Sequence, residues 1–187
     1  MRLTRERFED LYAASADPWG FATSDYEREK YARTLAALGD RRYATAFEAG
    51  CSIGVLTAAL ATRCDALLAV DIAQAAVDAA RARLAGAGHV RVERRDLPEQ
   101  WPDGPFDLIV CSEVLYYFDA ATLREAIAAL RASLAPGGRV VAVHYLPRSS
   151  VDPITGDEAH ALLAAELGLP HVEGDRTDRY RLDVFGA

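Results

Sequence analysis

The sequence predicts an α/β protein: a doubly wound, mostly parallel seven-stranded sheet with helices on both faces, a C-terminal antiparallel strand pair and an N-terminal helical appendage. First, strand-like and helix-like segments alternate from Tyr43 onwards, which is typical of a parallel sheet flanked by helices. Second, a turn from Gly50 to Gly54 joins the first strand of this series to its first helix. Third, two short segments follow Gly168 with a polar, charged stretch between them, and they predict the antiparallel pair.

The N-terminal appendage is expected to contain two helices. Phe8, Leu11 and Tyr12 share one helical face and predict the first helix. A proline and a glycine in the segment ADPWGF interrupt the pattern. The S-x-x-E pattern at Ser24–Glu27 is a capping box that opens a second helix, and Gly39 ends it.

The α/β core is expected to alternate five parallel strands with three helices. The strands are predicted at Tyr43–Ala49, Ala66–Asp71, Val90–Arg94, Phe106–Ser112 and Arg139–Tyr145. The helices are predicted at Val55–Arg63, Ala73–Leu84 and Ala121–Leu134, with a turn at Pro136-Gly137-Gly138 before the fifth strand. A second capping box at Thr155–Glu158 opens a further helix that ends near Gly168. The antiparallel pair is predicted at His171–Glu173 and Arg179–Phe185.

Length and composition fit one globular domain. The chain has 187 residues, of which 51% are apolar, enough to bury a sizeable core. No repeat or linker divides it, so we expect residues 1–187 to form a single domain, with 1–40 as the helical appendage and 43–187 as the α/β core. The formal net charge is −7, which repels phosphate backbones and disfavours a nucleic-acid substrate.

The cysteines and the N-terminus indicate where the protein works. Cys51, Cys64 and Cys111 have no metal-ligand spacing, so we predict no metal site. Cys51 and Cys111 lie in apolar runs, where we expect small buried side chains. The first residues, MRLTRERFEDLY, are charged where a signal peptide would be apolar. No apolar run approaches the length of about 20 residues that spans a bilayer. We therefore predict a cytoplasmic protein without a membrane partner.

The segment from Glu48 to Gly54, E-A-G-C-S-I-G, is the strongest functional signal. Ligands of open parallel sheets bind beyond the carboxyl ends of the strands, where this turn lies. Gly50 allows a close backbone approach, and the following helix N-terminus offers free N–H groups. Asp71 ends the next strand, where a carboxylate can accept both hydroxyls of a ribose.

The turn favours S-adenosylmethionine over a dinucleotide. A dinucleotide fingerprint requires a second glycine for close approach of the pyrophosphate, and here Ser52 occupies that position. Glu48, two residues before Gly50, suits a cationic ligand group. A nicotinamide-dependent oxidoreductase is the alternative, although the short chain leaves little room for a substrate domain.

Several motifs together resemble a class I S-adenosylmethionine-dependent methyltransferase with a Rossmann-like fold. They are Glu48–Gly54, Asp71, Arg95-Asp96-Leu97, Phe106–Tyr117 and Leu134–Gly138. The resemblance implies that Gly50, Cys51, Ser52 and Gly54 hold the methionine moiety, that Asp71 holds the ribose, and that Ile72, Asp96 and Leu97 contact the adenine. It also implies that Cys111, Ser112 and Glu113 line the pocket below the methyl donor.

A narrower resemblance covers nearly the whole chain. Asp17-Pro18-Trp19, Tyr26-Glu27, Lys30-Tyr31, the EAGCSIG turn and SEVLYY at Ser112–Tyr117 resemble the nodulation protein S family. That family N-methylates a deacetylated amino sugar at the end of a chito-oligosaccharide. The resemblance implies a methyltransferase with a small-molecule acceptor, best an amino sugar or related metabolite. O-methylation of a natural product, with or without a metal, and a non-catalytic cofactor-binding protein remain alternatives.

Candidates for proton transfer are Glu113 and His144, because both lie at predicted carboxyl ends of strands. The alternatives are a cofactor contact for Glu113 and a structural or acceptor-binding contact for His144. His160 could reach the same cleft, although a surface helix position is the simpler interpretation.

Aromatic residues are the candidates for acceptor binding. Tyr116 or Tyr117 could present a ring face to a sulfonium, or could serve in packing. Trp19, Tyr26 and Tyr31 could form a lid that stacks on a sugar ring, or could anchor the appendage on the core.

Overall fold

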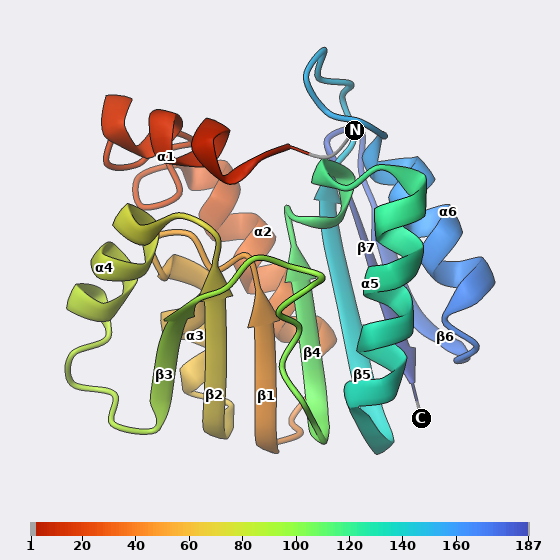
Figure 1. The fold of residues 1–187 in the computed structure, drawn as a ribbon. Coiled ribbons are helices and arrows are strands. Elements are labelled where there is room, and N and C mark those ends of the chain that lie inside the picture. The colour runs from red at the N-terminus through yellow and green to blue at the C-terminus, as the bar shows by residue number, and fades with distance from the viewer. Residues whose placement is uncertain (1–2, 187) are drawn as a thin grey trace.

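The structure, a computed structural model, describes residues 3–186, which form one seven-stranded sheet flanked by helices (Figure 1). The strand order is β3-β2-β1-β4-β5-β7-β6. The strands are β1 Tyr43–Ala49, β2 Cys64–Asp71, β3 Val90–Arg94, β4 Phe106–Ser112, β5 Leu134–Tyr145, β6 His171–Arg176 and β7 Tyr180–Gly186. The first five strands pair in parallel, and β7 is antiparallel to both β5 and β6. The predicted fold class is confirmed, including the antiparallel strands at the edge.

Six α-helices and one short 3-10 helix connect the strands. They are α1 Arg5–Ala14, α2 Asp25–Ala37, α3 Val55–Ala61, α4 Gln74–Arg83, η1 Leu115–Tyr117, α5 Ala120–Ser133 and α6 Gly156–Glu166. α5 and α6 cover one face of the sheet, where Leu123 and Leu163 pack against Ile109 and Val140. α2, α3 and α4 cover the other face, which makes the sheet doubly wound.

Several predicted boundaries differ from the structure, and the starts of two strands differ for the same reason. The chain enters β5 already at Leu134, which pairs with Phe106. The predicted turn around Gly137 is therefore an irregular beginning of β5, with a register shift after Phe106. Strand β2 also begins earlier than predicted, at Cys64. In both places the neighbouring strand continues to offer hydrogen bonds, and pairing overrides the local sequence preference.

The two predicted capping boxes have different outcomes. Thr155 and Glu158 form a complete box at the start of α6. At the start of α2 the Ser24 hydroxyl accepts the N–H of Glu27 at 3.4 Å, but the Glu27 carboxylate does not return the contact. It is paired with Lys30 instead, so tertiary pairing replaces half of the box.

The two N-terminal helices have different surroundings. Helix α2 packs into the core next to α3 through Leu38 and Tyr31. Helix α1 lies above the edge of the sheet formed by the carboxyl ends of the strands (Figure 1), and it packs on α4 through Phe8 and Tyr12. Within residues 3–186, no helix has the length and apolar character needed to cross a membrane.

Candidate active site

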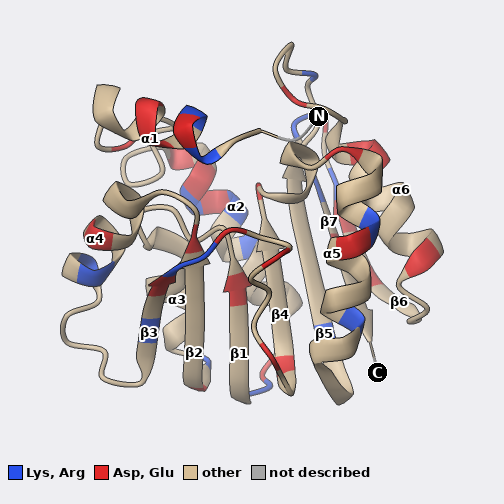
Figure 2. Cartoon of the chain, viewed as in Figure 1, with Lys and Arg blue, Asp and Glu red and all other residues tan. Residues whose placement is uncertain are grey.

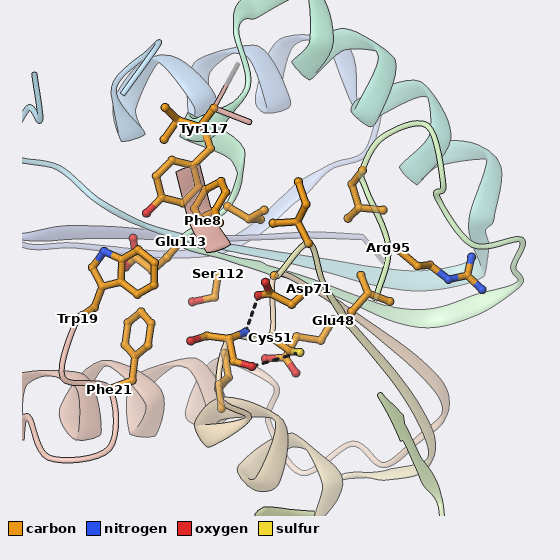
Figure 3. Close-up of a pocket in the computed structure, with 18 of the residues that line it drawn as sticks. Phe8, Trp19, Phe21, Glu48, Cys51, Asp71, Arg95, Ser112, Glu113 and Tyr117 are labelled. Atoms are coloured by element: carbon orange, nitrogen blue, oxygen red, sulfur yellow. Dashed lines mark hydrogen bonds between the residues drawn. The ribbon is translucent and has the colours of Figure 1, made fainter. Parts of the chain in front are cut away.

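A pocket lies between the carboxyl ends of β1, β2 and β4 and the N-terminal segment, and it encloses about 930 Å³, partly open to solvent. Acidic residues lie at or near the carboxyl ends of β1 and β2 (Figure 2). Trp19, Glu113 and Tyr117 lie at one end of the pocket and Arg95 at the other (Figure 3). The pocket is therefore long enough to bring one ligand end near the aromatic residues and the other near β3.

The turn after β1 forms the base of the pocket. Gly50 has φ of +76°, and a Cβ there would lie 3.1 Å from the Cβ of Val114. Both features require glycine. Gly54 also has a positive φ, but a Cβ there would meet Ala80 at 3.0 Å, so this glycine serves the packing of α3 on α4. Ser52 has φ of +48°, and its N–H is turned toward the carboxylate of Asp71.

Asp71 at the end of β2 accepts two backbone hydrogen bonds. Its Oδ2 accepts from the N–H of Ser52 at 2.8 Å and its Oδ1 from the N–H of Ala73 at 3.0 Å. Burial raises the pKa of Asp71 to about 6, although these hydrogen bonds oppose the shift. The carboxylate is thus fixed at the pocket wall, and each oxygen retains a lone pair for a ligand hydroxyl.

Glu48 on β1 is a buried acceptor without a donor. Its side chain lines the pocket with 1% exposure. Its Oε2 has no hydrogen-bond partner among residues 3–186, and burial raises the pKa of this carboxyl to about 8. A buried oxygen without a partner is costly, so a ligand that brings an ammonium group would satisfy it. Glu48 and Asp71 together fit a ligand that carries an amino-acid end and a ribose.

The opposite end of the pocket is formed by residues after β2 and β3. Ile72 and Leu97 offer apolar surface, and Asp96 lies beside them. The guanidinium of Arg5 on α1 pairs with Asp96 Oδ2 at 3.1 Å. This contact ties the appendage to the loop after β3.

Aromatic residues of the N-terminal segment cover the pocket. The Tyr12 hydroxyl is 2.5 Å from the Ser52 hydroxyl, and its ring meets Trp19 edge to face at 5.7 Å. Trp19 stacks on Phe21 at 5.6 Å, and Phe8 meets Tyr117 at 5.0 Å. The sequence analysis used Phe8 and Tyr12 to define a helical face and did not place them at the site. Nothing in the sequence around these two residues indicates that they line the pocket.

Glu113, which follows β4, is the centre of a second group of contacts. Its Oε2 accepts from the Tyr116 hydroxyl at 2.5 Å and from the N–H of Tyr145 at 3.0 Å. Its Oε1 accepts from Lys30 Nζ at 2.5 Å. Glu113 has φ of +55°, a strained conformation that turns its side chain into this network.

Lys30 on α2 is a functional candidate that the sequence analysis missed. Its side chain is 1% exposed, and its Nζ also contacts the two carboxylate oxygens of Glu27 at 3.0 Å and 2.8 Å. A lysine is almost never fully buried unless it is paired. The signal in the sequence is that Lys30 directly precedes Tyr31, a residue of the apolar stripe of α2.

His144 lies inside the protein rather than at the pocket. The N–H of Leu115 donates to His144 Nε2 at 3.0 Å, so this nitrogen is unprotonated. His144 Nδ1 then donates to His160 Nε2 at 3.0 Å, and His160 Nδ1 donates to Asp183 at 2.7 Å. Burial lowers the pKa of His144 well below its usual range. Both nitrogens are engaged, so the ring has none left to receive a proton from the pocket. His160 is buried as well, and is not a surface residue.

Most of the predicted site residues lie together. The pocket is lined by Trp19, Tyr31, Glu48, Gly50, Cys51, Ser52, Asp71, Ile72, Asp96, Leu97, Ser112, Glu113 and Tyr117. Away from its wall lie Gly54, Cys111, His144, Tyr116, which is bonded to Glu113, and Tyr26, whose ring packs beside Lys30.

The three cysteines lie in the interior of the protein. Cys111 points to the face opposite its neighbour Ser112, because side chains alternate along a strand. All three cysteines are free and buried, as predicted for Cys51 and Cys111. Residues 3–186 contain no group of three or more His, Cys, Asp or Glu side chains that could hold a metal ion.

Known proteins resemble this chain in sequence and in fold. The sequence model of the family described as Nodulation protein S (NodS) matches residues 6–166. Nodulation protein S from Rhizobium tropici is 37% identical over 130 residues, which are 68% of this chain and 55% of that protein. The chain thus spans little more than half the length of this curated relative.

Two solved structures extend the comparison. The structure of N-methyltransferase NodS from Bradyrhizobium japonicum WM9 in complex with S-adenosyl-L-homocysteine has a TM-score of 0.87 and 26% identity, and the match covers 97% of each chain. A structure from Pseudomonas syringae is 42% identical with a TM-score of 0.78, and the match covers 87% of this chain and 99% of that one. The chain belongs to the nodulation protein S family.

Proposed function

We propose that this chain is an S-adenosylmethionine-dependent methyltransferase that methylates the nitrogen of a small molecule. The acceptor that we favour is an amino sugar or a related metabolite. The observation that carries the proposal is the unpartnered, buried Oε2 of Glu48 beside the Asp71 carboxylate in one pocket. Family membership and the NodS structure with S-adenosyl-L-homocysteine support it.

Residues at the carboxyl ends of the strands would hold the cofactor. Glu48 and the turn at Gly50 suit its amino-acid end, Asp71 its ribose hydroxyls, and Ile72 and Leu97 its adenine. When bound, the cofactor supplies a methyl group on a sulfonium, already activated for direct displacement. The protein therefore contributes mainly alignment and the exclusion of water.

Glu113 is the residue that we assign to the acceptor. A carboxylate oxygen can accept two hydrogen bonds, and Oε1 accepts one from Lys30, so it has capacity for a donor from the pocket. The acceptor nitrogen must lose one proton in the transfer. Glu113 can receive that proton or pass it to solvent at the open side of the pocket.

Among the described residues that line the pocket there is no histidine or lysine to act as a base, and this favours an amine over a hydroxyl acceptor. A sugar amine titrates somewhat like an α-amino group, with a pKa of about 7.7–8, so a neutral fraction exists at physiological pH. A hydroxyl acceptor requires a stronger base. His144, the imidazole predicted as a base, has both nitrogens engaged, and this favours N-methylation over O-methylation.

Calorimetric titration with S-adenosyl-L-homocysteine tests the cofactor, with Asp71→Ala as the comparison. We expect micromolar binding by the wild type and a loss of at least about tenfold in the variant, since charged hydrogen bonds contribute about 1.5–3 kcal/mol. NADH serves as the control ligand. Binding of NADH without binding of S-adenosyl-L-homocysteine would favour the oxidoreductase alternative.

Transfer of labelled methyl groups tests the activity. We expect glucosamine to be methylated and N-acetylglucosamine not, because the acetylated nitrogen has no basic lone pair. Cofactor binding without transfer to any amine would leave the O-methyltransferase and the non-catalytic protein as the alternatives.

A further inference from the structure

Glu27, Lys30 and Glu113 form a buried charge cluster at the acceptor end of the pocket. Lys30 Nζ contacts the carboxylate of Glu27 at 2.8 Å and that of Glu113 at 2.5 Å. The side chains of the three residues are 9%, 1% and 11% exposed, respectively. Glu113 lines the pocket, whereas Glu27 and Lys30 lie behind it on α2.

The cluster contains two carboxyl groups and one ammonium. Burial raises the pKa of Glu27, and the ammonium of Lys30 opposes this shift. With both carboxyl groups ionised, the cluster carries one uncompensated negative charge. Tyr26 and Tyr31 surround Lys30, with ring centroids 5.1 Å and 5.8 Å from Nζ. Burial raises the pKa of both phenols above the ordinary range, so they remain neutral.

Other charged groups near the cluster do not balance it. Asp152 lies close enough to Glu113 for the two carboxyls to interact, and its pKa is raised by burial and by that carboxylate. Arg179 stacks on Tyr26 at 3.6 Å, but it is exposed to solvent. His144 stays neutral. A cation that enters the pocket would therefore meet an excess of negative charge in a weakly solvated place.

We propose that the Glu27–Lys30–Glu113 cluster selects the charge of the acceptor, so that the pocket takes up an ammonium and discriminates against a neutral sugar of the same shape. The inference rests on the proposed function. Glu113 Oε1 would accept a hydrogen bond from the acceptor with its second lone pair, and Lys30 would hold that oxygen in place. Glu27 is a positioning residue, since it acts on Lys30 and contributes the excess charge without lining the pocket.

Glu27→Gln is the decisive variant because it removes the excess charge and keeps the side-chain size and one acceptor for Lys30. The readouts are KM and kcat for glucosamine at about pH 7.5, the inhibition constant of glucose as the neutral analogue, and the affinity for S-adenosyl-L-homocysteine. We expect KM for glucosamine to rise about tenfold, because a charge in a weakly solvated place attracts a nearby ammonium more strongly than a screened surface charge does. Glucose inhibition and cofactor affinity should be unchanged.

Glu29→Gln is the matched control. It removes the same charge from the same helix at a solvent-exposed position, where the charge is screened. We expect wild-type values for all readouts.

An unchanged ratio of glucosamine KM to glucose inhibition constant in Glu27→Gln, with cofactor binding intact, would overturn the inference. If Glu27→Gln does not fold, the wild type decides: glucosamine KM must rise from about pH 7 to pH 9 as the ammonium fraction falls, and a constant or falling KM would reject charge selection. A wild type that binds no cofactor and methylates no amine would instead contradict the proposed function itself.

Discussion

The carboxyl group of Glu48 connects proton binding to ligand binding. In the ligand-free protein, burial raises the pKa of this group to about 8, so it is mostly protonated at neutral pH. The ammonium of a bound amino-acid group favours the carboxylate form. Ligand binding should therefore release a proton from Glu48.

We predict that the affinity for S-adenosyl-L-homocysteine rises between about pH 6 and pH 8, by up to about tenfold per pH unit. Calorimetry in buffers of different ionisation enthalpy measures the released proton directly. The Glu48→Gln variant should bind more weakly and without this pH dependence. Proton uptake by the wild type on binding would contradict the proposed role of Glu48.

His144 makes folding sensitive to acid. Its ring stays neutral inside the protein because burial lowers its pKa well below 6.5, whereas in the unfolded chain it takes up a proton near about pH 6.5. The unfolded state then binds more protons than the native state. The stability that His144 contributes is therefore complete above that pH and is lost as the pH falls below it.

The prediction concerns the difference between the wild type and His144→Gln, whose amide oxygen can accept the same N–H of Leu115. This difference in unfolding free energy should be constant above about pH 7 and should shrink below it, by up to about 1.4 kcal/mol per pH unit. Denaturant titration from about pH 5 to pH 8 measures it. Comparing the two chains is necessary because Glu48 and Asp71, with raised pKa values, shift stability in the opposite direction. A difference that does not depend on pH would show that His144 titrates normally.

At the scale of elements, the turn from β1 into α3 depends on Gly50. Gly50→Ala places a Cβ at φ of +76° and 3.1 Å from Val114. The left-handed conformation alone costs about 1–2 kcal/mol. We expect the variant to lose both stability and cofactor affinity, measured by thermal unfolding and calorimetry.

Gly39→Ala separates these two effects. Gly39 also has a positive φ, of +64°, but a Cβ there meets nothing within 4 Å, and the residue does not line the pocket. We expect a similar loss of stability with unchanged cofactor affinity. Equal cofactor affinity in both variants would mean that close approach at Gly50 is not required for binding.

The N-terminal segment divides into a covering part and a structural part. The first part, through Phe21, supplies Phe8, Tyr12, Trp19 and Phe21 to the pocket. Helix α2 packs into the core instead, so removal of all 40 appendage residues would expose apolar surface. We therefore expect the chain without residues 1–22 to keep its fold, as read by circular dichroism, and to lose cofactor affinity by about tenfold or more, because several aromatic contacts are removed. Wild-type affinity in the shortened chain would argue against a lid.

At the scale of the whole molecule, the periodic parts could be predicted from the sequence. The bounds of β1, β3 and β4 agree with the expectation. β1 and β4 are short, mostly apolar segments, and β3 alternates valines with charged residues, as a half-buried strand does. The turn at Gly50 and the carboxylate of Asp71 follow from the general rule that ligands bind at the carboxyl ends of parallel strands.

The remaining part of the site depends on long-range contacts. Lys30 and Glu113 are 83 positions apart, and no spacing rule connects an appendage helix to the end of β4. For His144 the predicted position near the end of a strand is correct. Its ring, however, points into the interior and not into the pocket. A sequence pattern predicts where a residue lies along an element, and the packing decides which groups it meets.

The position of β7 between β5 and β6 has a consequence for synthesis. A ribosome releases β6 before β7, yet β6 pairs with β7 and not with β5. Until β7 emerges, the nascent chain presents the open edge of β5 to chaperones and to other chains. Asp183, which anchors the His160 and His144 hydrogen bonds, arrives on the same strand. The hydrogen-bonded support behind His144 is therefore completed only after β6 has left the ribosome.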